Sequence, residues 1–184
     1  MDGIAEDVRQ ELLVLAREAV RRALTGAEPP LVPASLSEMT EPRAAFVTIR
    51  SLEGELRGCR GEIPPRRPLP ECVCHVAVAS ALDDPRFPPV REEDLPALRF
   101  EISALTEPTR IRPEEVEIGR HGLLITTEWT AGLLLPQVPV SQRWYREGYL
   151  AALCVKAGLE TEAWRQDGVI LQAFEAEVWG ESER

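Results

Sequence analysis

The order of the periodic segments constrains the fold of this chain more than any other feature of its sequence. Apolar residues at helical spacing predict helices, and alternating or β-branched runs predict strands. In chain order, the predicted elements are a helix over 3–24, strands over 44–52 and from 55 onward, a helix over 70–83, strands over 98–104, 123–127 and 132–135, a helix over 141–158 and a strand over 169–178. Helices and strands do not alternate one by one, so the sequence predicts an α+β fold, with mainly antiparallel sheet flanked by helices.

The overall composition excludes several classes of protein. The 184 residues are 44% hydrophobic and 28% charged, which is typical of a globular protein. The length allows one substantial core or a core with a small appended subdomain. No apolar run approaches the ~20 residues that span a bilayer, and the acidic N-terminus is unlike a signal or transit peptide. We therefore expect a cytoplasmic protein that does not bind membranes. The net charge of −10 also argues against nucleic acid as a partner, because a polyanion is recruited by a positive field.

One segment of the second predicted strand has the composition of a site. Cys59 lies between Arg57 and Arg60, and Gly58 and Gly61 weaken the strand around it. A nearby guanidinium favours a reactive thiolate, and glycine leaves room for a bulge or for a ligand. In a regular strand Arg57 shares the face of Cys59, whereas Arg60 points away. The alternative is a structural cysteine, because free cysteine is among the most buried residue types.

Arginines near this segment form a second candidate feature. Arg66 and Arg67 lie in a proline-rich loop, and Arg86 follows the second predicted helix within Asp84-Pro85-Arg86-Phe87. Guanidinium groups bind carboxylates and phosphates in a forked geometry. Arg57 and Arg86 are the stronger candidates for binding a small anion, because each lies among residues that restrict the backbone. A solvated loop is the alternative for the others.

The two histidines differ in what they predict. His121 precedes a predicted strand in a glycine-rich turn, and it is a candidate general base for Cys59, as in Cys–His nucleophilic catalysis. A histidine that merely tolerates a tight turn is the alternative. Cys72 and Cys74 point about 200° apart around a helix, so together with His75 they do not predict a metal site. The sequence identifies no cofactor.

Five separated motifs, in the same order along the chain, resemble the AMMECR-one-type domain family, also called the AmmeMemoRadiSam system protein A family. The similarity covers most of the chain. The motifs are Leu56-Arg57-Gly58-Cys59-Arg60-Gly61, Pro65-Arg66-Arg67-Pro68-Leu69, Asp83-Asp84-Pro85-Arg86-Phe87-Pro88-Pro89 with Asp94-Leu95-Pro96, Gly119-Arg120-His121-Gly122-Leu123, and Gly132-Leu133-Leu134-Leu135-Pro136-Gln137-Val138. The family signature usually has isoleucine where this chain has Arg60.

This resemblance implies one AMMECR-one-type domain over residues 1–184, divided into two subdomains. The smaller subdomain is expected to be β-rich and to form a cleft, and the N- and C-terminal segments are expected to pack together in the larger one. The segment around Cys59 would form one wall of the cleft, and Arg86, Phe87, His121 and Gln137 would form the others. The resemblance also implies association with Memo-like and radical-SAM proteins, and it brings no established reaction.

Two functional hypotheses therefore remain open. In the first, Cys59 performs thiol chemistry on a small anionic substrate that Arg57 and Arg86 orient, with His121 as the base. In the second, the chain is a non-enzymatic binding or adaptor module, in which the cysteine contributes shape rather than reactivity. The ligand-binding residues are then Arg57, Gly58, Gly61, Arg86, Phe87 and Gln137.

Overall fold

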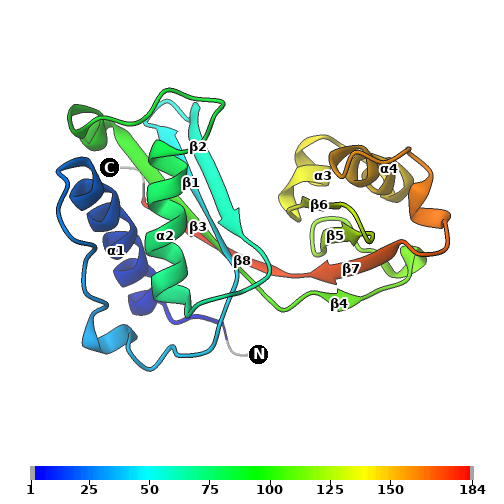
Figure 1. Ribbon diagram of the computed structural model, residues 1–184, viewed down its shortest axis with the longest axis horizontal. Coiled ribbons are helices and arrows are strands. Elements are labelled where there is room, and N and C mark those ends of the chain that lie inside the picture. Colours follow the sequence, from blue (N-terminus) through cyan, green and yellow to red (C-terminus); the bar gives the residue numbers. More distant parts are fainter. Residues whose placement is uncertain (1–2, 183–184) are drawn as a thin grey trace. The chain divides into compact units, whose positions relative to one another are not determined.

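The computed structural model describes residues 3–182, which divide into two units, each built around its own four-stranded sheet (Figure 1). Unit one comprises residues 3–105 and 177–182, and unit two comprises Thr106–Ala176. Strands within both sheets pair in antiparallel fashion, and helices flank them. The predicted α+β fold is therefore confirmed.

Unit one combines two long helices with a sheet of order β2-β1-β3-β8. Its elements are α1 (Glu6–Leu24), η1 (Ala34–Leu36), β1 (Ala45–Ser51), β2 (Leu56–Glu62), α2 (Leu69–Leu82), η2 (Glu92–Ala97), β3 (Leu98–Leu105) and β8 (Ala176–Gly180). The strand β1 lies between β2 and β3 and is antiparallel to both. This order leaves β2, the strand that carries Cys59, at the edge of the sheet.

The core of unit one lies between the helices and one face of this sheet. The helix α1 buries Leu12, Leu15 and Ala16, as its helical spacing predicts, and α2 packs beside it (Figure 1). From the sheet, Val47 and Ile102 point into the same core. Side chains alternate along a strand, so the neighbouring positions of β1 and β3 face the other side. Among residues 3–182, no helix has the length and apolar character that crossing a membrane requires.

Both ends of the chain belong to unit one. The indole Nε1 of Trp179 on β8 donates to the carbonyl oxygen of Arg9 on α1 at 3.0 Å. About two turns further along α1, the guanidinium of Arg17 donates to both carboxylate oxygens of Glu181 at 2.8 and 2.6 Å. These bonds fix the final strand to the first helix.

Unit two has a smaller sheet of order β4-β7-β5-β6 and its own core. Its elements are β4 (Thr109–Arg110), η3 (Pro113–Glu115), β5 (Gly122–Thr126), β6 (Ala131–Leu134), α3 (Gln137–Ser141), α4 (Arg146–Lys156), η4 (Ala163–Arg165) and β7 (Ile170–Phe174). Tyr149 on α4 is fully buried, and its hydroxyl lies 3.2 Å from the carbonyl oxygen of His121 and 3.1 Å from that of Leu134. This side chain therefore ties α4 to β5 and β6.

Two predicted elements are wrong in extent. The helix predicted over 141–158 is two helices, because Arg143 adopts a φ of 55° between α3 and α4, a conformation that no α-helix contains. The strand predicted over 169–178 is also two strands, β7 and β8, which pair in different sheets. Their alternating apolar residues match a single strand because both segments bury one face.

Candidate functional site

Cys59 lies at the middle of the edge strand β2, directly opposite Thr48 on β1. Its Sγ is 3.4 Å from the hydroxyl oxygen of Thr48, and either group can donate the hydrogen bond. The cysteine is partly exposed, whereas Thr48 is buried. Because Thr48 alternates with the core residues of β1, this pair occupies the face of the sheet opposite the helices.

A buried carboxylate holds the backbone of Cys59. The amide N–H of Cys59 donates to Asp84 Oδ2 at 2.9 Å, and Arg86 Nη2 donates to the Cys59 carbonyl oxygen at 3.3 Å. Asp84 and Arg86 are themselves joined by two bonds, Nε to Oδ1 at 2.9 Å and Nη2 to Oδ2 at 2.6 Å. The pair satisfies the outward N–H and C=O of Cys59, as a neighbouring strand would do.

This ion pair has a strongly fixed charge state. The hydrogen bonds from Arg86 hold the pKa of Asp84 far below its usual range, the backbone N–H of Cys59 acts in the same direction, and burial opposes both. The side chain of Asp84 is only 2% exposed, whereas that of Arg86 is 56% exposed. The carboxylate therefore neutralises one edge of the guanidinium, and only its outer edge is open to an anion. The guanidinium of Arg86 also stacks over the ring of Phe87, with its carbon 5.3 Å from the ring centroid.

The two glycines beside Cys59 make room for the protein's own atoms. A Cβ at Gly58 would lie 1.9 Å from the carbonyl oxygen of Ser80, which belongs to α2. A Cβ at Gly61 would lie 2.3 Å from the ring of Phe46. Because neither glycine has a side chain, α2 can approach β2 at Gly58 on one face, and Phe46 can cover β2 at Gly61 on the other.

Ser80 links three elements beneath the site. Its hydroxyl accepts from the N–H of Arg60 at 2.8 Å, and it lies 2.8 Å from the Val47 carbonyl oxygen and 2.7 Å from that of Val76. Arg60 pairs with the core residue Val47, which places it on the opposite face of β2 from Cys59. Arg60, which stands where the family signature usually has isoleucine, therefore lies on the same face of the sheet as α1 and α2, and its side chain is exposed there.

Arg57 is the extra residue of a bulge. Ile49 and Arg50 are adjacent on β1, yet they pair with Gly58 and Leu56, so Arg57 has no partner in the register. Strict alternation ends at Gly58, and the prediction that Arg57 shares the face of Cys59 stays a prediction. Its Nε is buried and has no hydrogen-bond acceptor among residues 3–182. An unsatisfied buried N–H costs about 1–3 kcal/mol.

The remaining predicted site residues belong to unit two. The Nδ1 of His121 accepts a hydrogen bond from the amide of Glu117 at 3.1 Å, within the turn before β5. Gln137 is the first residue of α3 and is exposed. Cys59 lies in unit one, so its pairing with His121 and the cleft between their segments remain predictions.

The other three cysteines are poor nucleophiles. Cys72 and Cys154 are completely buried, and Cys74 is partly buried. Burial raises the pKa of the Cys72 and Cys74 thiols to about 11, and it raises the pKa of the Cys154 thiol as well. Within residues 3–182, no three His, Cys, Asp or Glu side chains group in a way that could hold a metal ion.

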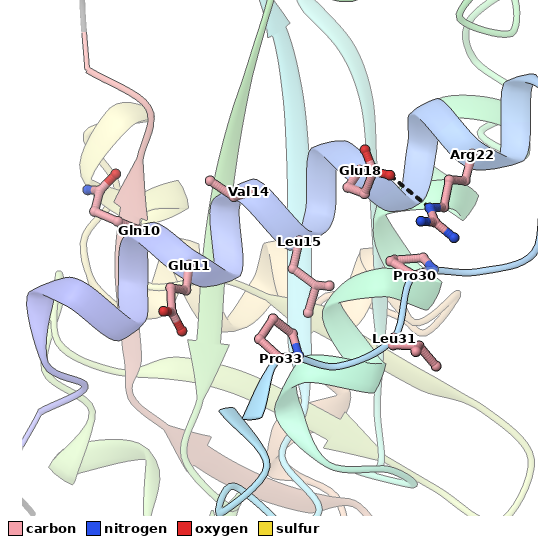
Figure 2. A pocket seen from close by; sticks show the side chains of 9 residues that line it. All are labelled: Gln10, Glu11, Val14, Leu15, Glu18, Arg22, Pro30, Leu31 and Pro33. Atoms are coloured by element: carbon pink, nitrogen blue, oxygen red, sulfur yellow. Dashed lines mark hydrogen bonds and ion pairs between the residues drawn. The ribbon is translucent and has the colours of Figure 1, made fainter. Parts of the chain in front are cut away.

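A groove in unit one lies away from Cys59. It has a volume of about 610 Å³ and runs between α1 and the loop over 30–33 (Figure 2). Apolar side chains such as Val14 and Leu31 line it, and the Glu18–Arg22 ion pair closes one end, as Figure 2 shows. Hydrogen bonds from Arg21 and Arg22 lower the pKa of Glu18 to about 2, so these charged groups already satisfy one another. The groove therefore offers apolar surface and little polar recognition.

Sequence reasoning identified Cys59 and Arg86 but missed Thr48, Ser80 and Asp84. Thr48 and Asp84 contact Cys59 from 11 and 25 residues away, and Ser80 contacts Val47 from 33 residues away, so no local pattern indicates these contacts. The signal available for Asp84 is its position directly after a helix and two residues before an arginine. That spacing allows the bidentate pair that the structure contains.

Comparison with known proteins assigns this α+β chain to a family. Residues 13–179 match the family model described as AMMECR1. The chain is 39% identical to a protein of Thermofilum pendens, covering 93% of this chain and 88% of that protein. It is 41% identical to protein MJ0810 of Methanocaldococcus jannaschii, covering 91% and 87%. The crystal structure of the uncharacterized protein PH0010 from Pyrococcus horikoshii superposes with a TM-score of 0.86 at 37% identity, covering 93% of this chain and 90% of that one. The chain belongs to the AMMECR1 family.

Proposed function

We propose that this chain is a non-enzymatic binding module that recognises an anionic group at the segment of β2 that carries Arg57 and Cys59. The observation that carries the proposal is the buried Nε of Arg57, which lacks an acceptor among residues 3–182. The Arg57 side chain as a whole is only partly buried, so a carboxylate or phosphate of a ligand would form a charge-assisted hydrogen bond with the exposed part of its guanidinium. The bulge at Arg57 supports the same role, because bulges redirect side chains beside binding sites.

The surroundings of Cys59 favour binding over catalysis. In the described part of unit one, the hydrogen-bond partner of its Sγ is the Thr48 hydroxyl, which cannot act as a base near neutral pH. The two charged contacts of its backbone, Asp84 and Arg86, are joined in an ion pair with each other. The thiol accordingly contributes shape and a weak hydrogen bond to the surface.

The partner classes follow from the family resemblance. We propose an adaptor that acts in the cytoplasm with a Memo-like protein and a radical-SAM protein, where reducing conditions keep Cys59 a free thiol. The anionic group would be a carboxylate of such a partner or a small anionic ligand that the two share. A net charge of −10 argues against nucleic acid in this role.

Thiol chemistry on a small anionic substrate is the second candidate. It is supported by the partial exposure of Cys59 and by the protonated state that burial imposes on Cys72 and Cys74. Thiol chemistry needs a base that takes the proton of Cys59, and the described contacts of Cys59 in unit one do not include one. We propose His121 for this role.

A binding experiment separates these two candidates. The purified chain is titrated calorimetrically with the Memo-like protein of the same organism, and Arg57→Ala is expected to weaken binding by about tenfold, equivalent to about 1.4 kcal/mol. Cys59→Ser is expected to bind like the wild type, because it preserves size and hydrogen bonding. Arg66→Ala, in an exposed loop position, is the matched control and is expected to have no effect.

The two possible failures have different meanings. Wild-type binding by Arg57→Ala would overturn the binding role of Arg57. Loss of biological activity in a folded Cys59→Ser variant that still binds its partner would instead favour thiol chemistry.

A further inference from the structure

Unit two contains a concave site that is separate from the Cys59 segment. Its volume is about 360 Å³, within the range of small-molecule pockets. The residues that line it include Arg110, Ile111, Arg112, Glu115, Trp164 and Leu171. All of them belong to unit two, so the pocket is complete within a single unit.

One positive charge in this pocket is uncompensated. Arg112 donates to Glu115 at 2.9 Å and also lies 3.9 Å from a carboxylate oxygen of Glu114, so its charge is compensated. The bond from Arg112 lowers the pKa of Glu115 to about 2. Arg110, on β4, is exposed and makes no side-chain hydrogen bond or ion pair with any residue of 3–182. A single free guanidinium in a chain of net charge −10 marks a local preference for an anion.

The rest of the pocket is an apolar wall with one unused donor. Ile111 and Leu171 join the core of unit two, and Trp164 packs against the same core. The guanidinium carbon of Arg165 lies 3.8 Å from the centroid of the Trp164 ring, which holds that ring in place. The indole N–H of Trp164 is buried and has no acceptor within residues 3–182.

We propose that this pocket binds a small amphipathic carboxylate. The carboxylate pairs with Arg110, and the hydrocarbon part of the ligand packs on Ile111, Leu171 and the Trp164 ring. The proposal is independent of the binding role of Arg57, because the two sites share no residue.

Phenylacetate is a suitable probe, and phenylacetamide is its uncharged control. The readout is the set of indole N–H signals of the four tryptophans in a ¹H–¹⁵N spectrum, with the Trp164 signal assigned by its loss in Trp164→Phe. We expect phenylacetate to shift the Trp164 signal saturably with a Kd on the order of 1 mM, and phenylacetamide to bind about tenfold more weakly.

Two variants complete the test. Arg110→Gln is expected to weaken phenylacetate binding about tenfold and to leave phenylacetamide unaffected, because only the charge is removed. Arg143→Gln, an exposed arginine of unit two outside the pocket, is the matched control and is expected to bind like the wild type. Unchanged signals of the other tryptophans show that each variant is folded.

Three results would overturn the proposal. They are a Trp164 signal that does not move with phenylacetate, equal binding of the acid and the amide, and wild-type affinity in Arg110→Gln.

Discussion

Asp84 has the most defined role of any single residue near Cys59. Its carboxylate receives hydrogen bonds from the Cys59 amide and from two nitrogens of Arg86, while its side chain is almost completely buried. A carboxylate in this position must keep its partners, because a buried charge without them is costly. The sequence Asp84-Pro85-Arg86 is therefore a device that holds the backbone of Cys59.

Asp84→Asn tests this role through stability. We expect the free energy of unfolding, measured in urea near pH 7, to fall by about 1–3 kcal/mol, because the amide keeps the size of the side chain but loses the charge-assisted bonds. The exposure of Arg86 moderates the loss. Asp83→Asn is the control, since Asp83 is exposed, and its effect is expected to stay within about 0.5 kcal/mol.

The same variant has a predictable dependence on pH. The pKa of Asp84 is lowered in the folded chain, so its contribution is complete above the unfolded value of about 3.9 and is lost as the pH falls through the folded value. Urea unfolding at several pH values should therefore show the gap between wild type and Asp84→Asn closing only below about pH 4. A gap that closes between pH 8 and 6 would contradict this assignment.

The four thiols are expected to differ in reactivity. Iodoacetamide at pH 8 should label Cys59 first, because Cys72 and Cys154 are completely buried and the pKa of Cys74 is raised to about 11. Peptide mass spectrometry after timed quenching gives the rate at each site. A faster rate at Cys74 than at Cys59 would contradict the exposures in the structure.

Residue types alone were enough to select Cys59 and Arg86 but not to assign their roles. A cysteine between arginines and glycines is conspicuous, and its neighbours suggested ligand binding. The structure gives Gly58 and Gly61 a packing role, because Ser80 and Phe46 fill the space beside them. Contacts made between distant segments decide such roles, and no local pattern contains them.

At the scale of elements, α2 and β2 are in close backbone contact at Gly58. This contact depends on Gly58, where a methyl group would overlap the carbonyl oxygen of Ser80. The Ser80 hydroxyl, 2.8 Å from the Arg60 amide, fixes the register of the same contact. The helix cannot move away without breaking this bond and opening the core beneath Val47.

Gly58→Ala should therefore be strongly destabilising. We expect the free energy of unfolding to fall by about 3 kcal/mol or more, because the clash is with helix backbone rather than with a flexible side chain. Gly148→Ala is the matched control, since a Cβ there meets nothing closer than 3.9 Å and alanine favours the helix α4. Chemical denaturation of both variants measures the difference, and equal stability of the two would refute the close contact.

The predicted elements were reliable where one hydrophobic pattern served one element. The periodicity of α1, α2 and β3 gave their type and their bounds within a few residues. It failed between α3 and α4, where the positive φ of Arg143 breaks a continuous helical pattern. It failed again between β7 and β8, because consecutive strands of two sheets have the same alternation as one long strand.

At the scale of the whole molecule, the chain has two hydrophobic cores rather than one. The first contains Val47 and Ile102, and the second contains Leu123 and Tyr149, all completely buried. Each core lies within its own unit and draws on its own sheet. A core mutation should then affect mainly the unit in which it lies.

Hydrogen exchange can test this separation. Leu123→Ala is expected to cost about 2–5 kcal/mol in unit two, so the amides of β5 and β7 should lose protection while those of β1 keep it. Ile102→Ala is the reciprocal variant and should affect β1 and β3 while sparing β5. Equal loss of protection in both units for either variant would show that the chain unfolds as one cooperative body.

The clamp on Cys59 also bears on how copies of this protein behave in concentrated solution. An edge strand with free N–H and C=O groups can add a strand from another molecule, and this is a common route to aggregation. Asp84 and Arg86 bind the N–H and the C=O of Cys59 at the centre of β2, with which an added strand would have to pair. The residues that position the cysteine thereby also leave its backbone without free groups to which a strand of another copy could bind.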